Sequence, residues 1–239
     1  MNKKIKMFLS VILVFAFVFI CACSSKPALS PQESGYIKIN DEEISKEYIG
    51  YFFYLAKQNM LSEAGFNEEN STDEDIRLFW ENTEIEGKSA IDTARDFAVN
   101  HSIDLKVQYL KALKEGITLT DDVIQSFENE ISEVIKLQGG EKDFDKKLAD
   151  MDTNRESYKT IRLENLYVQK LFQKYIEDKI ITVNNDEILK FKETYGDEAL
   201  TDEDISNQIM NNKFEQLVSV WRNETQIIIN DENIKKFNV

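Results

Sequence analysis

Cysteine, histidine, proline and glycine are all scarce in this 239-residue chain. The only cysteines are Cys21 and Cys23, so no disulfide can cross-link a domain that follows them. The stability of such a domain must come from an apolar core. A single histidine, His101, provides neither a Cys/His metal cluster nor the base of a hydrolase triad, and we expect it to be a surface or half-buried helix residue. Two prolines and eight glycines favour helices over a turn-rich β fold.

Positive charge is also scarce, with 29 basic residues against 44 acidic ones. A chain this acidic should not bind nucleic acid or an anionic lipid surface by charge. The negative charge is compatible with binding of basic or neutral polypeptides, or it serves only to keep the protein soluble. No glycine-rich phosphate loop is present, since the Gly139-Gly140 pair followed by Glu141 reads as a helix stop. Acidic triplets at 73–75 and 202–204 fall at predicted helix starts, where the helix dipole favours negative charge by about 0.3–1 kcal/mol. We expect them to stabilise these helix starts, and the alternative is that they bind calcium. We expect no metal, no cofactor and no small-molecule substrate.

The amino terminus has the pattern of an export signal. Three lysines precede an apolar run over residues 7–20, which is shorter than the roughly 20 residues of a membrane-spanning helix. The sequence Ile20-Cys21-Ala22-Cys23 that ends this run resembles the lipobox of bacterial lipoproteins. The resemblance implies cleavage between Ala22 and Cys23, a diacylglyceryl group on Cys23, and anchoring at the extracytoplasmic face of the cell membrane. An uncleaved anchor, or an ordinary secretory signal cut nearby, is the alternative.

The rest of the chain divides into a short tether and one helical domain. Residues 1–22 are the predicted signal and 23–34 the lipidated tether, so the mature chain has 26 basic and 44 acidic residues, a net charge of −18. Apolar residues at helical spacing, together with caps, predict a mainly α domain over 35–239. Ser45 is a predicted N-cap, Gly116 a predicted left-handed helix end, and Ser71/Glu74 and Thr153/Glu156 are predicted capping boxes. The predicted helices cover 46–61, 71–80, 89–115, 120–138, a short stretch around 144–148, 153–181, 184–196 and 202–222.

Two short apolar runs of β type lie at opposite ends of this domain, at 36–39 and 226–229. A single short strand is not stable alone, so we expect the two to pair and bring the ends of the domain together.

Several segments together resemble the SurA- and PrsA-like extracytoplasmic foldases. The resemblance is carried by their order along the chain rather than by any one motif: 39–48 (INDEEISKEY), 116–124 (GITLTDDVI), 139–158 with its Gly-Gly pair, and 181–188 (ITVNNDEI). The resemblance implies a multi-helix chaperone domain that binds unfolded exported polypeptides.

The chain departs from this family at one place. Members with prolyl isomerase activity carry a parvulin domain after the segment that matches 183–195, and that chemistry uses a pair of histidines. Only 44 residues follow Tyr195, and His101 is the single histidine, so we expect no isomerase activity. Phe66, Phe79 and Trp80 are candidate client contacts beside a loop, although core packing is the favoured interpretation for them, and the roughly 100° between positions 79 and 80 could turn one of these two rings outward. A scaffold lipoprotein with one dedicated folded partner is the competing function.

Overall fold

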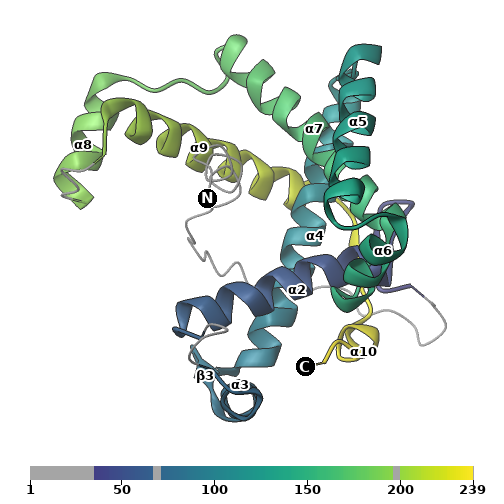
Figure 1. Ribbon diagram of the computed structural model, residues 1–239. Coiled ribbons are helices and arrows are strands. Elements are labelled where there is room, and N and C mark those ends of the chain that lie inside the picture. The colour runs from purple at the N-terminus through teal and green to yellow at the C-terminus, as the bar shows by residue number, and fades with distance from the viewer. Residues whose placement is uncertain (1–34, 67–70, 196–199, 239) are drawn as a thin grey trace.

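The computed structural model describes residues 35–66, 71–195 and 200–238, and this part of the chain is mainly helical, as predicted. Two small sheets accompany the helices (Figure 1). In chain order the described helices are α2 (Lys46–Glu63), α3 (Asp73–Asn82), α4 (Ala90–Lys114), α5 (Asp121–Leu137), α6 (Glu141–Asp150), α7 (Arg155–Glu177), α8 (Asn185–Tyr195), α9 (Asp202–Glu224) and α10 (Asp231–Ile234).

The predicted pairing of the two ends of the domain is confirmed. Strand β1 (Ile37–Ile39) pairs antiparallel with β5 (Ile227–Ile229), with Ile37 opposite Ile229. Strand β2 (Glu42–Ile44), which the sequence did not predict, pairs with the other edge of β1 and completes the order β2-β1-β5. The tight turn between β1 and β2 places Asn40 at φ 52°, a left-handed conformation that asparagine tolerates better than most residues.

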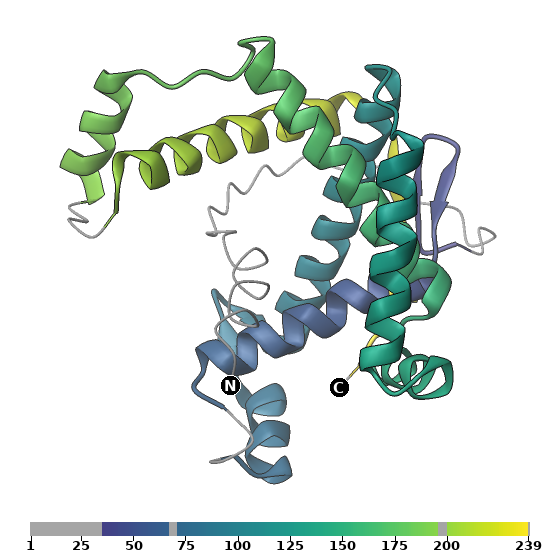
Figure 2. The ribbon, with the colours of Figure 1, turned by 45° about the horizontal axis from the view of Figure 1, so that its top comes forward.

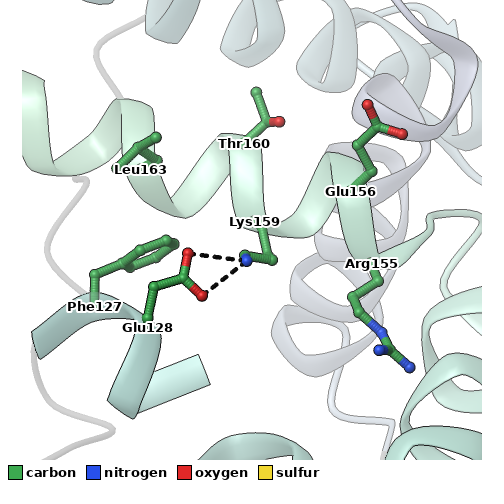
Figure 3. A pocket seen from close by; sticks show the side chains of 7 residues that line it. All are labelled: Phe127, Glu128, Arg155, Glu156, Lys159, Thr160 and Leu163. Carbon is green, nitrogen blue, oxygen red and sulfur yellow. Dashed lines mark hydrogen bonds and ion pairs between the residues drawn. The ribbon is translucent and has the colours of Figure 1, made fainter. Parts of the chain in front are cut away.

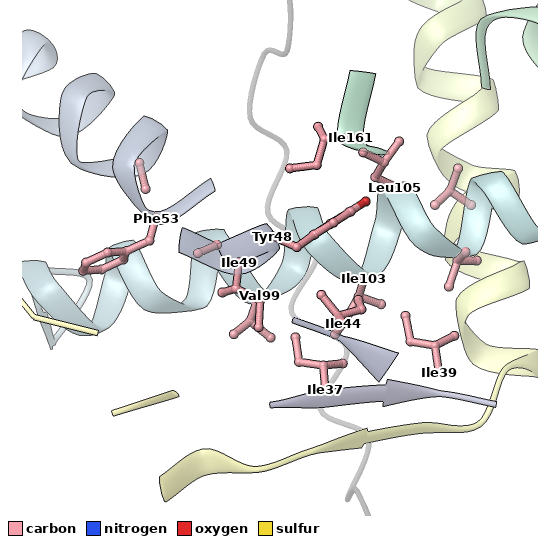
Figure 4. Packing of buried hydrophobic residues seen from close by; sticks show 14 of the residues in the cluster. Ile37, Ile39, Ile44, Tyr48, Ile49, Phe53, Val99, Ile103, Leu105 and Ile161 are labelled. Carbon is pink, nitrogen blue, oxygen red and sulfur yellow. The ribbon is translucent and has the colours of Figure 1, made fainter. Parts of the chain in front are cut away.

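Helix α4 is the centre of the fold and packs against α2, α7 and α9. Ala90, Ala94 and Ala98 are almost completely buried on it, and small side chains let neighbouring helices approach closely. Figure 4 shows the adjoining core, in which the β1 isoleucines face residues of α2 and α4. The sheet therefore closes one side of the helical body with apolar side chains from both ends of the domain.

Three helical parts project from this core. Helix α8 and the amino-terminal part of α9 extend away from the sheet in Figures 1 and 2, and α3 lies at the far end of α2 and α4. Helices α5 and α6 stand beside α7, and their buried residues Phe127, Ile131, Phe144 and Leu148 are outside the main core cluster. The domain thus has one large core and a smaller apolar cluster on its flank.

Close backbone approach joins α2 to the turn that follows α6. A Cβ atom on Gly50 would lie 2.0 Å from the carbonyl oxygen of Asp152, so only glycine fits at this point of α2. Lys57, two turns later on α2, forms an ion pair with the Asp152 carboxylate at 3.9 Å. This contact fixes where the α5–α6 unit sits relative to the core.

Of the four helix caps named from the sequence, two are right and two are displaced by one residue. Ser45 caps α2 by accepting a hydrogen bond from the Tyr48 amide at 3.2 Å, and Gly116 adopts φ 72° after α4. The predicted box at Ser71/Glu74 is wrong, because Thr72 caps α3 and Asp75 completes the box. The predicted box at Thr153/Glu156 is wrong as well. Asn154 caps α7, whereas the Thr153 hydroxyl is buried with no hydrogen-bond partner among the described residues.

Candidate polypeptide-binding surfaces

The residues of the predicted lipid anchor, Ala22 and Cys23, lie outside the described residues, as does the tether up to residue 34. Lipidation and membrane attachment therefore remain predictions from the sequence. Within the residues that the structure describes, no helix is both long enough and apolar enough to cross a bilayer.

The three aromatic residues predicted as client contacts occupy different environments. Trp80 is only 6% exposed and belongs to the core cluster, which agrees with core packing rather than client contact for this residue. Phe79 and Phe66 are half-buried, and their ring centroids lie 5.4 Å apart in an edge-to-face arrangement. The adjacent positions 79 and 80 are about 100° apart on a helix, which turns Trp80 inward and leaves part of the Phe79 ring accessible.

Helix α8 is the least covered helix of comparable length in the described structure, because none of its residues is buried. Leu189 is 57% exposed and Tyr195 is 68% exposed, and the Tyr195 ring lies 4.6 Å from that of Phe191. An exposed leucine alone is ordinary on a protein surface, but α8 also stands at the end of an extended arm (Figure 2). Its apolar side chains are therefore accessible to another polypeptide.

Polar contacts at its flanks hold α8 against α9. The Asn184 side chain caps α8 by accepting a hydrogen bond from the Glu187 amide at 3.0 Å, as the sequence predicted for its start. Lys213 of α9 pairs with Glu187 at 2.5 Å, and Lys192 pairs with Asp202. The arm therefore keeps its shape without covering Leu189 or Tyr195.

A groove of about 550 Å³ lies between α5 and α7, and the sequence did not predict it (Figure 3). Phe127 and Leu163 form its apolar part, and the Lys159 ammonium bridges it by pairing with both oxygens of Glu128 at 3.0 and 2.9 Å. A second ion pair, between Arg162 and Glu130, also joins α5 to α7. Two cations line the groove, Lys159 and Arg155, and both are in ion pairs.

A buried polar cluster links three helices. Tyr48 of α2 donates a hydrogen bond to Glu164 of α7 at 2.6 Å, and Lys106 of α4 pairs with the other oxygen of that carboxylate. Lys106 and Glu164 are only 8% and 3% exposed. Burial, together with the neighbouring Glu164 carboxylate, raises the pKa of Tyr48 well above its ordinary value. Because a substrate cannot reach these groups, the cluster positions α2, α4 and α7 rather than forming an active site.

His101 is half-buried on α4, in the position expected for it. Its ring contacts that of Phe97, with centroids 3.9 Å apart, and stacks on Phe52 at 6.1 Å. Burial lowers the pKa of His101 from 6.5 to about 4, so the imidazole is neutral at physiological pH.

The acidic triplets act at helix starts. Asp75 and Asp204 accept hydrogen bonds from the hydroxyls of Thr72 and Thr201 at 2.6 Å each and from the amides of the same residues at 3.0 Å each, and these bonds lower the pKa of both carboxyls. Across residues 35–66, 71–195 and 200–238, no group of histidine, cysteine and acidic side chains is arranged to hold a metal ion.

Comparison with known proteins returns no match to any protein-family model, curated protein or solved structure.

Proposed function

We propose that this protein is a lipid-anchored, SurA/PrsA-like chaperone of the extracytoplasmic membrane face, which binds unfolded exported polypeptides and does not isomerise prolyl bonds. The observation that carries the proposal is the exposure of Leu189 and Tyr195 on α8, a helix with no buried residue. Unfolded chains expose apolar side chains, and these gain free energy when a chaperone surface removes them from water.

Binding at such a surface is weak and unselective by its nature. Apolar burial contributes about 25 cal/mol per Å² and has no directional requirement, so side chains of different clients can occupy the same place. The mature net charge of −18 adds repulsion between copies of the protein, which keeps an apolar surface soluble. These properties match a holdase that releases its clients unchanged.

The predicted lipid on Cys23 places this surface where exported chains emerge. Each buried methylene adds about 0.8 kcal/mol, and two acyl chains are enough for stable anchoring. The tether over residues 23–34 then provides a span of several nanometres at most between membrane and domain.

The second candidate function is a scaffold lipoprotein with one dedicated folded partner. The groove between α5 and α7 favours it, because the Lys159–Glu128 and Arg162–Glu130 ion pairs set the geometry of a preformed site. A preformed groove selects one complementary shape, whereas exposed side chains on α8 accept many.

An aggregation assay distinguishes the two functions. The chain from Ser24 onward contains every described residue and is mixed with several unrelated denatured proteins at near-equal molar ratio. We expect suppression of aggregation for several clients and no acceleration in a parallel prolyl isomerisation assay. The double variant Leu189→Ser/Tyr195→Ser should bind clients roughly tenfold more weakly, because two largely exposed apolar side chains are lost.

The matched control is Ile124→Ser/Leu137→Ser on α5, which also removes two exposed apolar side chains but from a different helix. It should suppress aggregation as the unaltered protein does. If no client is protected, the chaperone proposal is refuted, and isolation of a single stoichiometric partner from membranes would then support the scaffold.

A further inference from the structure

The outer face of α3 exposes a leucine among carboxylates. Leu78 is 42% exposed, although it lies in the middle of a ten-residue helix. Residues three and four positions apart are neighbours on a helix surface, and for Leu78 these include Glu74, Asp75 and Glu81. Leu78 thus lies beside three carboxylates on its own helix, of which Glu74 and Glu81 pair with Arg77.

The half-buried Phe79 extends this apolar surface, and Phe66 packs edge-to-face on Phe79 with ring centroids 5.4 Å apart. We call Leu78, Phe79 and Phe66 the α3 patch. Two half-buried phenylalanine rings and a leucine provide rigid apolar contact area at low cost in side-chain entropy.

The charge around the α3 patch is strongly one-sided. Residues 71–89 contain six carboxylates and two cations. Both cations are already in ion pairs: Arg77 with Glu74 and Glu81 at 2.6 Å each, and Lys88 with Asp96. Arg77 therefore offsets part of the charge of Glu74 and Glu81, and residues 71–89 keep a formal net charge of −4.

Helix α8 differs in this respect. It carries three carboxylates and two lysines, and one of these lysines pairs with Asp202 of α9. Counted over the helices alone, α8 has a formal net charge of −1 and α3 of −3, so charge selects less at α8 than at α3. The two surfaces are similar in exposed apolar groups and different in charge.

We infer that the α3 patch docks polypeptide segments in which lysine or arginine stands beside apolar residues. The apolar residues of the segment cover Leu78 and Phe79, and its cations lie over the surrounding carboxylates. The inference rests on the proposed chaperone function and names the class of client that this surface selects. A second copy of the chain is the wrong occupant on charge, because each copy carries a formal net charge of −15 or more negative.

Peptide binding tests the inference directly. Three fluorescent peptides share the same length and apolar residues and carry lysine, glutamine or glutamate at the remaining positions. Fluorescence anisotropy with the chain from Ser24 onward should give an affinity for the lysine peptide about tenfold above that for the glutamate peptide at low salt. The difference should shrink at high salt, because exposed charges are screened beyond a Debye length of about 10 Å at 0.1 M.

Two exposed leucines provide a matched pair of variants. Leu78→Ala should weaken binding of the lysine peptide about fivefold. Leu113→Ala removes the same atoms from a site 43% exposed, but Leu113 is on α4 and outside the α3 patch, so it should leave binding unchanged. Glu84→Gln/Glu86→Gln removes two charges from the adjoining β3 (Glu84–Ile85) and its turn, and should reduce the preference for lysine over glutamate. Circular dichroism of each variant checks that the fold is kept.

The outcomes separate this inference from the proposed function. Equal binding of the three peptides, or equal losses in the two leucine variants, overturns the inference even if aggregation is still suppressed. Self-association that Leu78→Ala abolishes would also overturn it, because the occupant would then be a second copy. A lysine preference that depends on Leu78 supports the α3 patch, and it does so even if no denatured protein is protected, in which case only the chaperone proposal fails.

Discussion

His101 should make the stability of the fold fall between pH 8 and pH 5. Burial against Phe97 and Phe52 lowers its folded pKa to about 4, whereas the unfolded value is 6.5. A proton therefore binds the unfolded chain more tightly than the folded one. The stability that this neutral imidazole provides is complete above the unfolded pKa and is lost as pH decreases toward the folded pKa.

The size of the effect follows from linkage. At pH 5 the imidazole is roughly 97% protonated in the unfolded chain and roughly 10% protonated in the folded one, which removes about 2 kcal/mol of stability relative to pH 8. Any folded pKa up to about 5 gives a loss within roughly 0.4 kcal/mol of this value. Domains of this size have about 5–15 kcal/mol in total, so the loss is readily measured.

The assay is urea unfolding at pH 8 and pH 5, followed by circular dichroism, for the natural chain and for His101→Phe. The variant keeps an aromatic ring against Phe97 and Phe52 but has no proton to bind. Other groups with shifted pKa values, such as Asp104 and Glu215, titrate in both proteins and cancel in the comparison. We expect the natural chain to lose about 2 kcal/mol more than the variant. A difference below about 0.5 kcal/mol would refute the burial argument.

Two further substitutions test the packing of the helical body. Gly50→Ala should destabilise the fold by about 2 kcal/mol or more, because the added Cβ would lie 2.0 Å from the carbonyl oxygen of Asp152. Helix propensity alone predicts the opposite, so an increase in the urea midpoint of unfolding would contradict this reasoning. Lys106→Met should cost about 3–5 kcal/mol by leaving the Glu164 carboxylate buried without its cation, and Lys106→Met/Glu164→Leu should recover most of that loss. If the double variant is as unstable as the single one in thermal unfolding, the charge of Glu164 is not the cause.

The helices and the strand pair were accessible from the sequence because their signals are local and repeated. Helical spacing of apolar residues extends over many turns in α4, α7 and α9, so errors at single positions do not alter the interpretation. The pairing of β1 with β5 followed from a simple exclusion, since neither strand is stable alone.

Helix ends and short strands were less accessible. The segment Ser71-Thr72-Asp73-Glu74-Asp75 contains two overlapping capping boxes one residue apart, and their local chemistry is equivalent. Strand β2 has only one buried residue in three, so it lacks the alternation that indicates a strand, and it exists because β1 offers it an edge.

The residues of the candidate surfaces were likewise only partly predictable from the sequence. Phe66 and Phe79 were singled out from their place beside a loop, but their neighbour Trp80 is in the core. Leu78 and Leu189 fall within two predicted helices, and nothing in their local sequence indicates that they are exposed. An apolar residue is uncovered only when no other element packs over it, and sequence periodicity does not contain that information.

The sequence by itself determined the helical class, the approximate extent of most helices and the pairing of the two ends of the domain. It also carries the only indication of a membrane anchor, at Cys23. Tertiary structure alone decided which apolar side chains are exposed, how Tyr48, Lys106 and Glu164 come together, and where the groove beside α7 lies. The physical reason is range: helix formation depends on neighbours within about four residues, whereas exposure and buried pairing depend on contacts between segments far apart in the chain.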